Sequence, residues 1–211
     1  MPTRSLFWFR RDLRLNDNPA LLDALAAADE TLLLFIMDDE IADRAGAYRR
    51  AYLADSLARL DESVGGRLAI ITGSPASVLA EVIKRYSITS IHAASQYAPY
   101  GVAAEESIAA GGIHVEFTGS NYAVAPGRVR KSDGTNYRVY TPFFNAWQIH
   151  GWRAPVEEPK EPRFTTPQAR DRNLPIWVAP AGIILQEAGE AAARARWRSG
   201  WCCGRWAPRL R

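Results

Sequence analysis

The sequence predicts an α/β fold built on a five-stranded parallel sheet with helices on both faces. Between residues 1 and 118, five short strand-like runs alternate with stretches of helical periodicity. The second of these runs, residues 31–38, is apolar throughout, as parallel strands buried on both faces tend to be. Strands that alternate with helices favour a doubly wound sheet joined by right-handed crossovers.

Local signals place the individual elements. Strands are expected at residues 5–9, 31–38, 66–73, 87–95 and 113–117. Two helices should begin at Asn18-Pro19 and Ser74-Pro75, because a side-chain cap followed by proline at the first helical position is a typical helix start. The leucines at positions 53, 57 and 60 share one face of a third helix, and residues 101–110 are expected to form a fourth.

The second half of the sequence changes character. Residues 119–150 are expected to be irregular, and residues 155–180 hold six of the 13 prolines, which indicates an extended linker. The predicted division is therefore an α/β domain over residues 1–150, a linker over 151–186 and a new helix over 187–197. Residues 198–211 lose all periodicity and have two interpretations, an out-of-frame tail, which we favour, or a short basic-aromatic arm.

Composition excludes several classes of protein. With 47% hydrophobic and 23% charged residues the chain has the balance of a globular protein. No apolar run approaches the roughly 18 residues that span a bilayer, and no signal peptide is evident, so a cytoplasmic location is expected. Both cysteines, Cys202 and Cys203, are adjacent, and the three histidines are far apart. We therefore expect no metal site.

The net charge of +3 gives no reason to expect nucleic-acid binding. Four arginines and no acid follow Trp197, and without those four the net charge of residues 1–196 is −1. Binding of DNA by bulk charge is therefore not expected.

Ligands of doubly wound sheets bind outside the carboxyl ends of the strands. No glycine-rich phosphate loop follows any predicted strand here. Charged residues do crowd the end of the first strand, in the segment FRRDLRLNDNPAL (residues 9–21). These charges have two interpretations that the sequence leaves open: they pair with one another, or they face an anionic ligand.

Two segments carry a resemblance to a known family. LFWFRRDLRLNDNPAL (residues 6–21) resembles the opening of the photolyase/cryptochrome family, and GTNYRVYTPFFNAW (134–147) resembles a second family segment at the usual distance. Residues 189–197 resemble the first helix of the family's flavin-binding helical domain. The resemblance implies the amino-terminal antenna domain of a deoxyribodipyrimidine photolyase, truncated before its FAD-binding domain.

The resemblance also implies a chemistry. Family members hold FAD in the helical domain, and light-excited reduced FAD passes an electron to a pyrimidine dimer flipped out of DNA. The α/β domain often holds an antenna chromophore, a deazaflavin or a folate. Because the flavin domain is missing, no catalytic residue is expected here. Alternatives are a cryptochrome-like light sensor and a stand-alone chromophore- or nucleotide-binding module.

Antenna-site candidates follow from the resemblance alone. They are Arg11, Phe35, Ile36, Met37, Asp38, Arg49, Gln96, Tyr97 and Gly101. In deazaflavin-binding relatives a segment like D-x-E-P-Y follows the fourth strand, whereas Gln96 and Ala98 replace both acids here. An altered site is therefore expected. The aromatics of residues 140–147 are expected to face the helical domain, and self-association is expected where nothing covers them.

Overall fold

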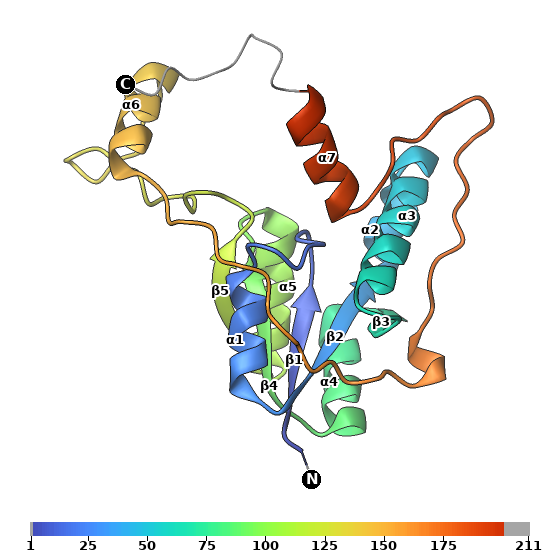
Figure 1. Cartoon of the computed structure of the whole chain (residues 1–211). Helices are drawn as coiled ribbons and strands as arrows, with labels where there is room; N and C mark the ends of the chain where they lie inside the picture. The colour runs from blue at the N-terminus through green and yellow to red at the C-terminus, as the bar shows by residue number, and fades with distance from the viewer. Residues whose placement is uncertain (1, 201–211) are drawn as a thin grey trace.

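The computed structural model describes residues 2–200 and confirms the predicted fold class (Figure 1). Five parallel strands form one sheet in the order β3-β2-β1-β4-β5. The strands are β1 (Arg4–Phe9), β2 (Glu30–Met37), β3 (Leu68–Thr72), β4 (Ile88–Ser95) and β5 (Glu116–Ser120). The first four lie where the sequence predicts them.

Helices cover both faces of the sheet and divide its core into two layers. They are α1 (Pro19–Ala27), α2 (Asp39–Arg44), α3 (Ala47–Ser63), α4 (Pro75–Tyr86) and α5 (Pro99–Ala110). Alternate residues of β1 point to opposite faces, so Leu6 packs in the layer beneath α4 while Phe7 packs in the layer beneath α1 and α3. The predicted caps form: the Asn18 side chain accepts from the N–H of Leu21, and that of Ser74 accepts from the N–H of Ser77.

The fifth strand begins later than predicted. It covers Glu116–Ser120 rather than residues 113–117, and most of its residues are exposed at the sheet edge. The apolar residues that suggested a strand lie in the preceding loop, where Val115 is buried and Ile113 packs against the core. The apolar residues of this packed loop therefore gave the sequence pattern that is typical of a strand.

The expectation that residues 119–150 are irregular is wrong for their last eleven residues. Tyr140–His150 form α6, in which no residue is buried. Pro142 lies in its first turn, where proline is tolerated, and Gly151 ends it with a φ of 66°. Figure 1 shows α6 and α7 (Glu190–Gly200) beyond the carboxyl end of the sheet. Helix α7 passes Trp197, where the sequence suggested that helical order ends; residues 201–211 of the suspected tail lie outside the described residues.

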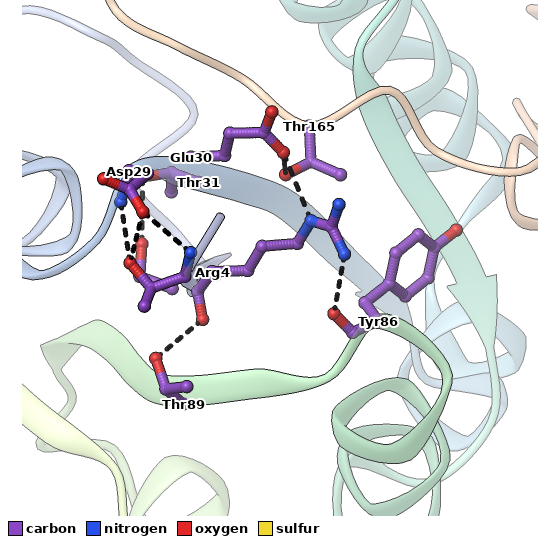
Figure 2. Close-up of polar contacts among 9 residues, drawn as sticks. Arg4, Asp29, Glu30, Thr31, Tyr86, Thr89 and Thr165 are labelled. Carbon is purple, nitrogen blue, oxygen red and sulfur yellow. Dashed lines mark hydrogen bonds and ion pairs between the residues drawn. The ribbon is translucent and has the colours of Figure 1, made fainter. Parts of the chain in front are cut away.

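The proline-rich segment is extended, but part of it packs on the α/β domain. After α6 it runs along one face of the sheet to its amino end and returns past α3 to α7 (Figure 1). Phe164 forms a parallel bridge with Thr31 of β2, and Arg172 forms one with Ile70 of β3. Thr165 is buried, and its hydroxyl donates to the Glu30 carboxylate. The same carboxylate forms an ion pair with Arg4 at 3.2 Å (Figure 2).

A buried polar cluster fastens this segment. Asp171, in the 3-10 turn Ala169–Asp171, forms an ion pair with Arg85 and accepts the Tyr86 hydroxyl at 2.5 Å. Burial, aided by the Asp171 hydrogen bond, raises the pKa of Tyr86 to about 12. That hydroxyl also accepts the N–H of Gln168 at 2.8 Å. Residues 163–173 therefore pack on the α/β domain. No helix among residues 2–200 is long and apolar enough to cross a membrane.

Candidate functional site

The strand order creates a switch point between β1 and β4. From β1 the chain winds outward through β2 to β3, and it then crosses back to β4 on the other side of β1. The connections after β1 and β4 therefore leave in opposite directions at the carboxyl edge, where ligands of such sheets bind. Arg10 and Arg11 follow β1 at this place, and Gln96 and Tyr97 follow β4.

Arg10 lies across this switch point, with only 5% of its side chain exposed. Its guanidinium forms an ion pair with Glu105 of α5 and donates to the carbonyls of Ala94 at 3.4 Å and Gly101 at 3.3 Å. The guanidinium carbon lies 4.6 Å from the centroid of the Trp8 ring, a cation–π distance. The protein's own cation thus occupies the position at which an α/β sheet usually offers space to a ligand.

Gln96 and Gly101 close the neighbouring space. Gly101 is buried, and a Cβ atom built on it would lie 2.5 Å from Oε1 and 2.7 Å from Cβ of Gln96. The backbone N–H of Gln96 donates to Glu105 at 3.4 Å. The glycine is therefore needed so that the Gln96 side chain can lie directly on α5.

Tyr100 connects α5 to the end of β2. Its hydroxyl donates to the Asp38 carboxylate, which directly follows β2. The ring of Tyr97 packs edge-on against Tyr122 at 6.0 Å. Side chains from α5 and from the segments that follow β2, β4 and β5 thus pack at the carboxyl edge of the sheet.

The structure brings only some of the antenna candidates together. Asp38, Gln96, Tyr97 and Gly101 lie along the closed edge just described. Phe35 and Met37 are buried in the core layer beneath α1 and α3, and Ile36 is buried in the opposite layer. Arg11 and Arg49 are exposed.

The arrangement of these residues does not fit an enclosed chromophore. The cavities that we describe within residues 2–200 lie elsewhere. One of about 440 Å³ lies between the loop after β1, α3 and α7, and another of about 400 Å³ lies in the loop before α6. None of the nine candidates lines either cavity. Gln96 fills the space next to Gly101, so neither described cavity offers a deazaflavin or folate a place among the candidates.

The charges of the segment after β1 pair within the protein. The guanidinium of Arg14 donates to the carbonyls of Asn16 and Asp17 at 3.1 and 2.9 Å. Asp12 is buried and accepts from the N–H of Arg10 and the Asn18 amide, and burial raises the pKa of its carboxyl. Of the two interpretations of this segment, internal pairing is the one that these contacts support; only Arg11 is exposed.

The same segment holds the distant parts of the chain. The Asp17 carboxylate accepts from Arg153 at 2.5 Å and from the N–H of Val156 at 3.1 Å. Glu190, the first residue of α7, accepts from the N–H groups of Leu15 at 2.9 Å and Asn16 at 3.4 Å. The loop after β1 therefore fixes where both the post-α6 segment and α7 leave the domain.

Sequence reasoning did not select Arg10, Glu105 or Tyr100 as site residues, although the structure places all three at the switch point. A signal existed for Arg10, since it directly follows an apolar strand. A signal also existed for Tyr100, which takes the tyrosine position of the D-x-E-P-Y segment. For Glu105 none did, because nothing in a helix sequence shows which strand end it will face.

Comparison with known proteins shows the family to which this chain belongs. The family described as DNA photolyase matches residues 5–162, which include the loop after β1 and all of the sheet except its first residue, Arg4. The chain belongs to the DNA photolyase family. A deoxyribodipyrimidine photo-lyase of Streptomyces griseus is 36% identical over 176 residues, covering 77% of this chain and 38% of the relative. One from Synechococcus is 30% identical over 212 residues, covering 90% and 44%.

One further relative and two solved structures are also similar to this chain. An uncharacterized 31.6 kDa protein of another Synechococcus strain is 31% identical over 207 residues, and 71% of that protein is covered. A class III photolyase structure from Agrobacterium tumefaciens matches 93% of this chain with a TM-score of 0.64 and 25% identity, over 38% of its own length. A Synechocystis cryptochrome has a TM-score of 0.76 at 20% identity, which is a likeness of fold alone. The chain thus spans less than half the length of the photolyases it matches.

Proposed function

We propose that this chain is the α/β module of a pyrimidine-dimer photolyase and that repair requires a flavin-binding helical part in addition. One observation carries the proposal. The chain aligns along up to 90% of its own length with deoxyribodipyrimidine photo-lyases, but it covers only 38–44% of the two described above. The alignment therefore concerns the α/β portion and says nothing of the remainder of those proteins.

The family resemblance implies where the chemistry belongs. Reduced FAD, held by the helical part, would supply the electron that splits the dimer. The residues of this chain would bind and orient that part. Helix α6, which lies beyond the carboxyl end of the sheet, supports this role. Glu190 attaches the start of α7, the segment that resembles the first helix of the flavin-binding domain, to the loop after β1.

Exposed apolar side chains on these helices support a docking role. Phe143, Ile149 and Trp197 are 38%, 87% and 71% exposed. Large apolar side chains at such exposure are typical of surfaces that another protein part covers. Because the antenna candidates form no cradle, we propose support of the helical part, rather than storage of a chromophore, as the role of the module.

A chimera tests this function. Residues 1–186 of this chain would be joined to the helical part of the Streptomyces griseus relative and expressed in a bacterium without photolyase. After ultraviolet irradiation, the chimera should restore survival under blue light to within about tenfold of the intact relative, and this chain by itself should restore none. Bound FAD, seen in the absorption spectrum of the purified chimera, verifies that the helical part has folded.

Two results would contradict the proposal. The first is light-dependent survival given by this chain without a helical part. The second is a chimera that binds FAD but gives no more survival in the light than in the dark.

A further inference from the structure

Positive charge is concentrated in one loop of the described chain. Residues 127–138, the basic loop, contain Arg128, Arg130, Lys131 and Arg138 and a single acid, Asp133. Residues 1–196 together have a net charge of −1, and the loop contributes +3, so the rest of residues 1–196 carries more acids than bases. The loop is therefore a cationic feature on a part of the chain that is otherwise acidic in sum.

The loop has a defined shape. Arg130 donates to the carbonyls of Gly127 at 2.9 Å and Gly134 at 3.1 Å, and both glycines have positive φ. Asp133 accepts from the backbone N–H and the hydroxyl of Thr135. Arg130 and Asp133 thus fold the loop, while the three other cations are exposed.

Two of those cations share a cavity. Lys131 and Arg138 line a cavity of about 400 Å³ together with Thr135 and Asn136. An ammonium, a guanidinium, a hydroxyl and an amide are the groups that most often bind phosphate oxygens in proteins. The cavity therefore has the chemistry of a phosphate site.

An aromatic ring lies at the end of this loop. Tyr140, two residues beyond Arg138, is 67% exposed. One face of its ring stacks on Phe144 of α6, with the centroids 5.6 Å apart and the planes at 17°. Because the ring is largely exposed despite this contact, its outer face is open to a further planar group.

We propose that the basic loop and Tyr140 bind single-stranded nucleic acid, with phosphates at Lys131 and Arg138 and a base stacked on Tyr140. Cations that follow a backbone beside an aromatic platform are the usual means of binding single strands. A duplex keeps its base faces stacked inside, so it could use the cations but not the ring. This inference concerns the chain without a helical part docked on α6, and the oligomer tests below are separate from the survival test of the proposed function.

Fluorescence anisotropy with a labelled twelve-residue oligothymidylate tests the phosphate site. Lys131→Gln/Arg138→Gln in the full chain should weaken binding about tenfold at low salt. It should also reduce the slope of log affinity against log salt by about 1.4, at roughly 0.7 for each lost phosphate contact. The matched control, Arg67→Gln/Lys84→Gln, removes two exposed cations elsewhere and should change affinity less than about twofold. Lys131→Arg/Arg138→Lys should preserve the slope.

A second comparison tests the stacked base. An abasic oligomer with the same number of phosphates should bind the wild-type chain about tenfold more weakly than oligothymidylate. For Tyr140→Ala, checked for folding by circular dichroism, the two oligomers should bind alike. The arginines of residues 198–211 are present in every variant, so their contribution cancels.

Several results would overturn the proposal. They are equal losses in the loop variant and its control, equal affinity of the wild type for the two oligomers, and no binding at low salt. A concentration-dependent dimer that the loop variant abolishes, seen by sedimentation without oligomer binding, would instead assign the loop to a second copy of this chain.

Discussion

Arg10→Met should lower the free energy of unfolding by about 3–5 kcal/mol, because it breaks a buried ion pair and leaves the partner carboxylate without its cation. Arg10 is only 5% exposed, and Glu105 is 22% exposed. In a chain of this size such a loss should reduce the melting temperature by about 10 °C. Glu105→Gln should have a comparable effect, since it leaves the guanidinium buried and unpaired.

A matched surface pair provides the control. Lys160 lies 3.8 Å from Glu157, and both side chains are almost fully exposed. Lys160→Met should therefore change the free energy of unfolding by less than about 0.5 kcal/mol. Urea titrations of the wild type and the three variants measure these values. Equal small effects for Arg10 and Lys160 would mean that the switch point is not closed by this pair.

Gly101→Ala should destabilise the domain by about 2–3 kcal/mol through a steric clash. Alanine in a helix normally gains about 1 kcal/mol over glycine, so a loss of this size would be opposite in sign to the helix propensity. The new Cβ would lie 2.7 Å from Cβ of Gln96, an atom that moves only with the backbone. Thermal melts and urea titrations should both show the loss.

Two further variants separate the clash from other effects. Gly46→Ala is the control, because nothing lies within 4 Å of its Cβ position and its φ is −63°. It should be neutral or slightly stabilising. Gln96→Gly removes the clashing atoms, so adding it to Gly101→Ala should recover at least 1 kcal/mol of coupling energy in a double-mutant cycle. Additive losses would show that Gln96 does not lie on Gly101.

Local signals explain why most of the fold could be predicted from the sequence. The caps at Asn18 and Ser74 and the apolar runs of the first four strands involve residues close together in the chain. The predicted bounds of the fifth strand were wrong because Val115, although buried, lies in the loop before the strand. An apolar sequence alone does not distinguish a strand from a packed loop. Helix α6 was missed because its aromatic residues are exposed and give no pattern of a buried face.

The candidate site could be predicted only in part, because its contacts join residues far apart in sequence. Arg10 and Glu105 form an ion pair although they are 95 positions apart in the sequence, and Leu15 donates to Glu190, which is 175 positions away. The residues next to each of these positions in the sequence do not indicate which partner it contacts. The family resemblance selected Asp38, Gln96 and Gly101, which lie at the carboxyl edge of the sheet, but it did not select Arg10, Glu105 or Tyr100.

The absorption spectrum of the chain after chromophore loading tests most directly whether this edge is closed. The purified chain would be incubated with excess deazaflavin or reduced folate, separated from free chromophore by gel filtration, and scanned. With Arg10, Gln96 and Tyr100 placed as described, we expect no retained band between about 370 and 450 nm, where such chromophores absorb. A stoichiometric band in the retained protein would contradict this account, since it would require an open cradle at the carboxyl edge of the sheet.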